Sequence, residues 1–183
     1  HTRCSRDWSS DVCSSDLNLV KLLGQPDNFD ALKKEVMDLV ASKLATENQL
    51  SLQTTLEDTG DWYSSAGTVL KLKNKNEREY NVLQPELKGT AIESIINKYN
   101  ATRSRIMISR PRSCYSVHKD DSYRIHIPIV TNPQSWMVWP YQNKCFNLEE
   151  GNVYWTNTTR YHSVFNGSLV DRVHLVMCVF QPV

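Results

Sequence analysis

The stretch from His118 to Val130 reads His-Lys-Asp-Asp-Ser-Tyr-Arg-Ile-His-Ile-Pro-Ile-Val. Isoleucine occupies positions 125, 127 and 129, and the positions between them include Arg124 and His126. A period of two is typical of a β-strand whose two faces meet different surroundings. The isoleucine face would pack against a covering layer. The other face would look either into solvent or into a cavity, where its cationic side chains would favour an anionic ligand.

Short strand-like runs continue from residue 103 to the C-terminal end, and turn signals separate them. In the last run Arg172 and His174 share one face, while apolar residues fill the other face at 173, 175, 177 and 179. We expect His174 to be structural, because nothing in the sequence pairs it with a metal site.

The N-terminal half has a different pattern. Apolar residues at helical spacing predict helices over residues 27–45 and 89–99, and alternation predicts strands over 48–55 and 67–73. Helices followed by closely spaced strands predict a mostly β fold. The expected architecture is a double-stranded β-helix (a jelly-roll, cupin-like barrel) with the N-terminal helices packed on one sheet.

His118 and Asp120 are separated by one residue, and His162 and Arg172 follow later in the chain. Residues two apart in a strand point to the same face, so His118 and Asp120 could reach one metal ion. Two histidines and one carboxylate form the facial triad of ferrous oxygenases, which leaves coordination positions open. We therefore predict that His118, Asp120 and His162 are the metal ligands and the catalytic site. A cation after the distal histidine, here Arg172, would hold the far carboxylate of 2-oxoglutarate.

Other metals remain open at this point. The same ligand set suits manganese or cobalt, and a closed structural zinc site would need a fourth ligand. Cys114 lies four residues before His118 and could supply that ligand.

Residues 115–132 read Tyr-Ser-Val-His-Lys-Asp-Asp-Ser-Tyr-Arg-Ile-His-Ile-Pro-Ile-Val-Thr-Asn. This run resembles the aspartyl/asparaginyl β-hydroxylase family of iron- and 2-oxoglutarate-dependent dioxygenases, and especially its free-proline (cis) hydroxylase branch. Further matches are Glu-Gly-Asn-Val-Tyr-Trp at 150–155, His-Ser-Val-Phe-Asn at 162–166 and Asp-Arg-Val at 171–173. The resemblance covers about residues 103–180, in family order. Peptide-aspartyl members have glycine where this chain has Asp120, which favours the free-amino-acid branch.

The resemblance implies an enzyme that uses Fe(II), 2-oxoglutarate and O2 and releases succinate and CO2. It would hydroxylate an unactivated carbon of an amino acid. That amino acid would be either free or an Asp, Asn or Pro residue of a peptide. Arg172 would bind the cosubstrate, and Arg124 and His126 would line its pocket. Because Asp120 fills the position that a halogenating relative leaves open for chloride, the resemblance implies hydroxylation.

Substrate contacts and two other functions stay open. A non-catalytic cupin-like metal- or ligand-binding module would tolerate loss of Arg172, and a metal-dependent isomerase or lyase would consume no oxygen. A substrate carboxylate would require a second cation, and aromatic side chains either line a pocket or belong to the core. The arginines are Arg105, Arg110, Arg112 and Arg160, and the aromatic residues are Trp136, Trp139, Tyr141 and Trp155.

Composition narrows the class of protein. The 21 Lys and Arg residues nearly balance the 20 Asp and Glu residues, for a net charge of +1, and no basic block predicts nucleic-acid or membrane binding. No apolar stretch approaches the ~20 residues that span a bilayer. Residues 7–17 resemble a translated sequencing adapter, so we treat 1–17 as non-native and expect one domain over 18–183. Three cysteines outside that tail, an odd number, predict a reducing compartment and a cytoplasmic protein.

Overall fold

The computed structural model describes residues 18–44, 47–68, 72 and 76–182. The segment expected to be non-native, 1–17, lies outside the described residues, and so does most of the strand expected at 67–73.

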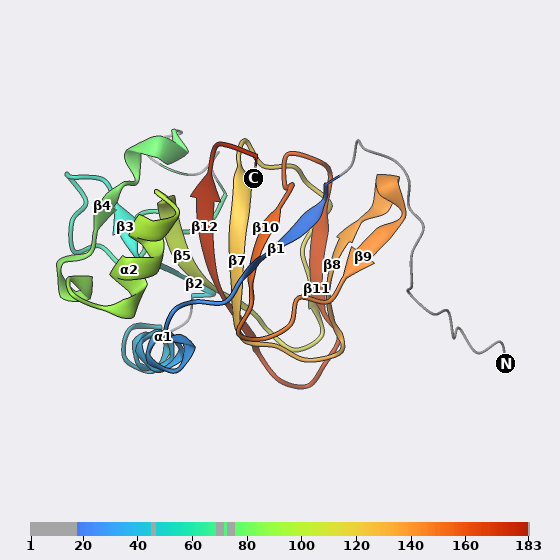
Figure 1. Cartoon of the computed structure of the whole chain (residues 1–183), viewed down its shortest axis with the longest axis horizontal. Coiled ribbons are helices and arrows are strands. Elements are labelled where there is room, and N and C mark those ends of the chain that lie inside the picture. Colours follow the sequence, from blue (N-terminus) through green and yellow to red (C-terminus); the bar gives the residue numbers. More distant parts are fainter. Residues whose placement is uncertain (1–17, 45–46, 69–71, 73–75, 183) are drawn as a thin grey trace, which may run out of the picture.

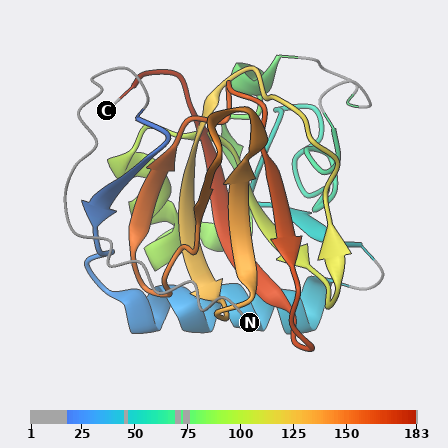
Figure 2. The same ribbon diagram turned by 90° about the vertical axis from the view of Figure 1, so that its right-hand side faces the viewer.

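Two antiparallel sheets form the barrel (Figure 1). The larger sheet has the order β1-β10-β7-β12-β5-β2, and the smaller has the order β6-β11-β8-β9. The strands of the larger sheet are β1 (Val20–Gly24), β10 (Val153–Thr156), β7 (Tyr123–Val130), β12 (Arg172–Val179), β5 (Thr102–Ser109) and β2 (Gln49–Ser51). Those of the smaller sheet are β6 (Ser113–Cys114), β11 (Ser163–Asn166), β8 (Ser135–Trp139) and β9 (Lys144–Phe146). Figure 2, which is turned by 90°, shows the smaller sheet in front of the larger one. The predicted jelly-roll fold is confirmed.

Shorter elements connect these sheets. The pair β3 (Gln53–Thr54) and β4 (Val82–Leu83) forms a two-stranded sheet of its own. The described residues also form three short 3-10 helices: η2 (Glu77–Glu79), η3 (Pro85–Leu87) and η4 (Pro140–Gln142). The strand expected over 48–55 is therefore divided between β2 and β3.

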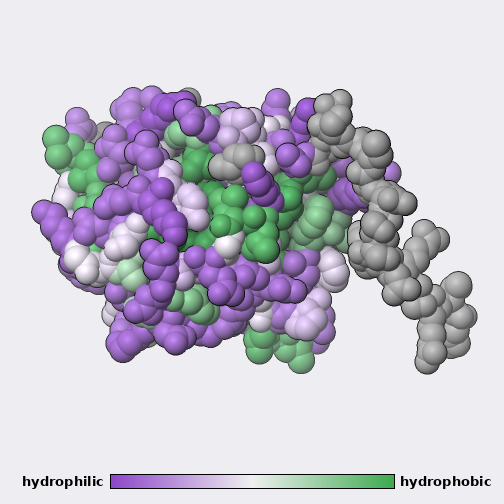
Figure 3. Space-filling model, in the orientation of Figure 1, coloured by the Kyte–Doolittle hydropathy of each residue, from purple (hydrophilic) through white to green (hydrophobic). Residues whose placement is uncertain are grey.

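Two α-helices cover the outer face of the larger sheet, as predicted (Figure 1). They are α1 (Phe29–Lys43) and α2 (Ala91–Lys98). Asn28 caps α1 by accepting a hydrogen bond from the Ala31 amide, and Thr90 caps α2 in the same way. Apolar side chains of both helices pack on the isoleucine face of β7 and the apolar face of β12 in one core. On the side seen in Figure 3, the helical layer exposes mainly hydrophilic side chains.

The polar faces of β7 and β12 point into the barrel. Arg124, His126, Arg172 and His174 are all buried, although none of them belongs to the apolar core. The alternative that this face of β7 meets solvent is therefore wrong. A second apolar cluster, with side chains from both sheets, fills another part of the interior. The barrel thus holds a cationic region beside an apolar one.

None of the helices in the described part of the chain is both long enough and apolar enough to cross a membrane.

Candidate metal centre

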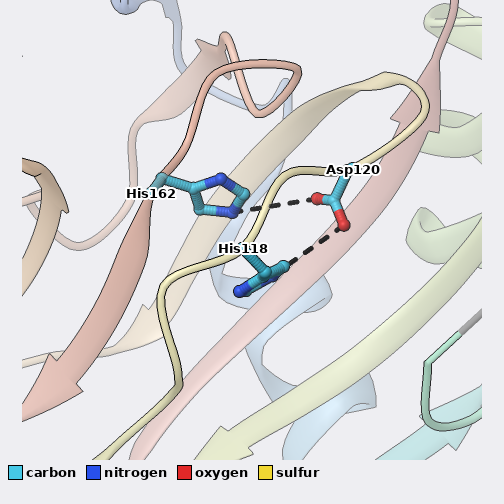
Figure 4. A group of neighbouring side chains, drawn as sticks. All are labelled: His118, Asp120 and His162. Atoms are coloured by element: carbon cyan, nitrogen blue, oxygen red, sulfur yellow. Dashed lines mark ion pairs between the residues drawn. The ribbon is translucent and has the colours of Figure 1, made fainter. Parts of the chain in front are cut away.

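Three side chains converge at one end of the barrel: His118, Asp120 and His162 (Figure 4). One ligand atom from each lies within 4.8 Å of the others. The His118 Nε2 atom is 3.9 Å from Asp120 Oδ1, and the His162 Nε2 atom is 3.8 Å from Asp120 Oδ2. His162 is buried, whereas His118 and Asp120 are partly exposed. The group is therefore open to solvent on one side.

Main-chain pairing brings the two histidines together. His118 and His162 form an isolated β-bridge, in which each amide donates to the other carbonyl, at 3.0 and 2.8 Å. The Asp120 amide donates to the Thr158 carbonyl at 2.8 Å. The prediction that His118 and Asp120 lie in a strand is wrong, because the residues between β6 and β7 form no regular strand apart from this bridge. The bridge and the Asp120 amide bond fix the geometry instead.

Each histidine is held in one tautomer by a carbonyl two residues before it. The Nδ1 atom of His118 lies 2.7 Å from the Ser116 carbonyl, and that of His162 lies 3.0 Å from the Arg160 carbonyl. A carbonyl oxygen can only accept, so Nδ1 carries the proton and Nε2 presents a lone pair toward Asp120. Such outer hydrogen bonds orient histidine ligands in metal sites.

Burial lowers the pKa of His162, although the neighbouring Asp120 carboxylate acts in the opposite direction. The imidazole is therefore neutral at pH 7, which is the form that coordinates a metal. No cysteine belongs to the convergent group among the described residues. Cys114 is exposed and its thiol lies near the Tyr115 carbonyl. The ligand set does not fit a closed zinc site.

A second polar cluster lies on the interior face of β12 and β7. The Arg172 guanidinium donates to His174 Nδ1 at 2.9 Å, and the His174 ring packs edge-on to the His126 ring at 5.8 Å. Among the described residues, both His126 nitrogens and the His174 Nε2 atom are buried without a hydrogen-bond partner. Burial lowers the pKa of Arg172 to about 10, so it stays charged at pH 7. The cluster offers one cation and unsatisfied N–H donors to an anion.

Arg124 joins this interior face to the metal centre. Its Nη2 atom lies 2.8 Å from Glu77 Oε1 and 3.3 Å from Asp120 Oδ1. Its Nη1 atom contacts Ser122 and Glu77. Glu77 was not singled out from the sequence, because it lies in a charged run that is typical of a solvated surface. Nothing local in that run signals its burial.

The remaining candidate arginines differ in how deeply they are buried. Arg105 is buried on the interior face of β5 and donates to Gln49 Oε1 and the Gly67 carbonyl, and it forms no ion pair among the described residues. Arg110 pairs with Asp171 at the surface, and Arg112 and Arg160 are exposed.

The four aromatic side chains are placed differently from one another. Trp155 belongs to the core under the helices, and Trp139 is buried with its ring 6.1 Å from that of His162. Trp136 is partly buried and Tyr141 is exposed. Of these four described side chains, Trp139 is the one whose ring contacts a residue of the metal centre.

The sequence profile of the aspartyl/asparaginyl β-hydroxylases matches residues 26–182. The chain belongs to this family. No curated protein sequence matches it.

Solved structures with the same fold are distant in sequence. The chain is similar to a viral collagen prolyl hydroxylase of Paramecium Bursaria Chlorella virus-1, solved as a 2OG complex, at 9% identity and a TM-score of 0.50 over 88% of this chain and 97% of that one. It is also similar to AviO1 of Streptomyces viridochromogenes, at 10% identity and a TM-score of 0.50 over 90% of both chains. A Pseudomonas putida prolyl-4-hydroxylase has a TM-score of 0.48 at 11% identity, over 89% of this chain and 93% of that one. At these identities the likeness to the viral hydroxylase and to AviO1 shows the fold alone.

Proposed function

We propose that this chain is an Fe(II)- and 2-oxoglutarate-dependent hydroxylase. The observation that carries the proposal is the convergence of two oriented Nε2 atoms and one carboxylate within 4.8 Å of one another. Three ligands of this type suit ferrous iron and leave further coordination positions for a cosubstrate and oxygen. In this proposal His118, Asp120 and His162 hold the metal, and the partly exposed side of the group admits the reactants.

The interior face of β12 and β7 fits 2-oxoglutarate. Arg172 would pair with the carboxylate far from the metal, since a guanidinium can bind a carboxylate through two parallel hydrogen bonds. His174 holds Arg172 by accepting a hydrogen bond from its Nη2 atom, at 2.9 Å. The buried nitrogens of His126 and His174 without partners support an anion there, because such groups are rarely left unsatisfied. Arg124 adds positive charge beside His126.

Bound iron and 2-oxoglutarate would supply the oxidising chemistry that hydroxylates an unactivated carbon, with release of succinate and CO2. The residues of this chain would hold both groups in register, present the substrate and keep water from the barrel interior. Trp139 beside His162 contributes to that exclusion of water from the buried side of the centre.

We propose a substrate that carries a carboxylate, such as a free amino acid. Of the four unassigned arginines, Arg105 alone is buried in the barrel, and it has no ion-pair partner among the described residues. Burial lowers the pKa of Arg105 to about 10, which still leaves it charged at pH 7. A buried cation without a counter-ion would be stabilised by an anionic ligand.

Anaerobic titration with ferrous iron and then 2-oxoglutarate tests the proposal. We expect a visible charge-transfer band for the wild type. Arg172→Ala should lose about 3–5 kcal/mol of cosubstrate binding, because a buried carboxylate loses its partner. At about 1.4 kcal/mol per decade, this is a hundredfold weaker affinity or more.

Arg110→Ala is the matched control, since Arg110 is an arginine of a surface ion pair and should leave the band unchanged. If the wild type binds iron without giving the band, a binding module or an isomerase replaces the hydroxylase. If the band forms, succinate release with a panel of amino acids and peptides identifies the substrate class.

A further inference from the structure

Glu77 is a buried carboxylate outside the barrel strands. It lies in the short helix η2, and its side chain is only 2% exposed. Its Oε1 atom accepts from Arg103 at 2.6 Å and from Arg124 at 2.8 Å, and its Oε2 atom accepts from the Ser122 hydroxyl at 2.6 Å. Three donors from two parts of the chain, Arg103 in β5 and the pair Ser122 and Arg124 at the start of β7, therefore fix this carboxylate in place.

The contact continues from Glu77 to the metal centre through one arginine. The Nη2 atom of Arg124 lies between Glu77 Oε1, at 2.8 Å, and Asp120 Oδ1, at 3.3 Å. A guanidinium is planar and rigid, so the carboxylate that holds one edge also sets where its other donors point. Glu77 therefore determines where the Arg124 guanidinium lies relative to the Asp120 carboxylate.

Asp120 differs from the other two proposed ligands in how its side chain is held. His118 and His162 are each oriented by a main-chain carbonyl, whereas the Asp120 carboxylate forms an ion pair with the Arg124 guanidinium, at 3.3 Å. The rotation of the Asp120 carboxylate consequently depends on a side chain, and that side chain depends on Glu77.

We infer that Glu77 is a positioning residue of the metal centre, which orients the Asp120 carboxylate by fixing the Arg124 guanidinium. The inference rests on the proposed function, because it assigns Glu77 to a site that binds a metal. Outer partners of metal ligands typically change metal affinity by about 10- to 100-fold when they are removed. If Glu77 served only to neutralise the charge of the buried arginines, its removal would lower the stability of the chain without changing its affinity for the metal.

Glu77→Gln, in the full chain, separates these two roles. It keeps the shape of the side chain but replaces one acceptor oxygen by a donor, so Arg124 loses its fixed position. We expect Co(II) affinity, measured by calorimetric titration, to fall by at least about tenfold. We also expect the visible Co(II) spectrum to change, because it reports the coordination geometry.

Arg103→Met is the matched control. Arg103 contacts the same Glu77 oxygen from a different position, and in the described part of the chain it forms no ion pair with Asp120. This variant should unfold at a lower temperature in circular dichroism and still bind Co(II) like the wild type. Equal loss of Co(II) affinity in both variants would overturn the inference, and so would wild-type affinity in a folded Glu77→Gln variant.

Glu77→Asp decides the matter if Glu77→Gln does not fold. It retains the negative charge between Arg103 and Arg124 but withdraws the carboxylate by one methylene. Weaker Co(II) binding supports positioning, and unchanged binding overturns it. If the wild type itself does not bind Co(II), the proposed function fails first, and the two failures are thereby distinguished.

Discussion

Two histidines are buried on the interior face of the barrel, and their burial makes the free energy of unfolding depend on pH. Burial lowers the pKa of His126 and of His174 well below 6.5, and the charge of Arg172 lowers both further. Each imidazole is therefore neutral in the folded chain at a pH where it would be protonated in the unfolded chain. The unfolded state binds more protons below pH 6.5, so stability falls as the pH falls.

We expect the free energy of unfolding of the metal-free chain to decrease below pH 6.5, by up to about 1.4 kcal/mol per pH unit for each histidine. Urea unfolding in the presence of a chelator, at a series of pH values, measures this slope. His174→Asn keeps an acceptor for Arg172 and does not titrate. The free energy of unfolding of this variant should therefore depend less steeply on pH, by the contribution of one histidine. A slope identical to that of the wild type would contradict this account.

Glu77 titrates in a separate window. Burial alone would raise its pKa, but Arg124, the Ser122 hydroxyl and Arg103 together lower it from 4.5 to about 2. Its contribution to stability is complete above 4.5 and is lost as the pH falls toward 2. The two slopes can therefore be measured independently.

At the scale of elements, one residue of α1 caps α2. The Glu35 carboxylate accepts hydrogen bonds from the amides of Ala91 and Ile92, both at 3.0 Å. These amides belong to the first turn of α2, where a negative charge also interacts favourably with the helix dipole. The same contact thus fixes how the two helices of the covering layer pack together.

Glu35→Ala should lower the free energy of unfolding by about 1–2 kcal/mol, because two amides lose their acceptor. Chemical denaturation measures the change. Asp38→Ala is a matched control on the same helix, since the Asp38 side chain forms an exposed pair with Lys34 and its loss should cost less than about 0.5 kcal/mol. Equal losses in the two variants would show that the cap contributes nothing of its own.

The sequence predicted some elements well for a physical reason. In β7 and β12 one face packs on the helical layer and the other carries the buried Arg124, His126, Arg172 and His174, so polar and apolar residues alternate readably at the start of each strand. The helix predicted over 27–45 is observed as α1, and that over 89–99 as α2. In contrast, β1 reads Val-Lys-Leu-Leu-Gly, which has no clear period, and the sequence analysis missed it.

The candidate site was predictable where its residues form a local motif. His118 and Asp120 stand one residue apart, and the distal His162 follows the family order. The carbonyls of Ser116 and Arg160 carry no sequence signal, because every residue has one. Glu35 and Glu77 also escaped prediction, since their partners lie at least 26 residues away and only the folded chain brings them together.

At the scale of the whole molecule, the metal centre joins distant parts of the chain. His118 and Asp120 precede β7 of the larger sheet, whereas His162 precedes β11 of the smaller sheet. A metal bound by all three side chains would cross-link segments that are 42 or more residues apart in the sequence. The three ligands converge only in the folded state. Binding to the native state alone stabilises it by mass action.

We expect Mn(II) at about 100 times its dissociation constant to raise the free energy of unfolding by ~2.7 kcal/mol. Denaturation with and without Mn(II) measures the effect, and a chelator should reverse it. His162→Ala removes one ligand and should abolish the stabilisation. If Mn(II) stabilised that variant as much as the wild type, the ion would be acting at another site.

The carbonyls behind the two histidines have a consequence for evolution. Ser116 and Arg160 are both exposed, and only their main-chain oxygens aim the imidazoles. Mutation can therefore replace either side chain freely while the rings keep their orientation. Selection acts at these two positions on the path of the backbone, and descendants of this chain can diverge there without losing the ability to hold a metal.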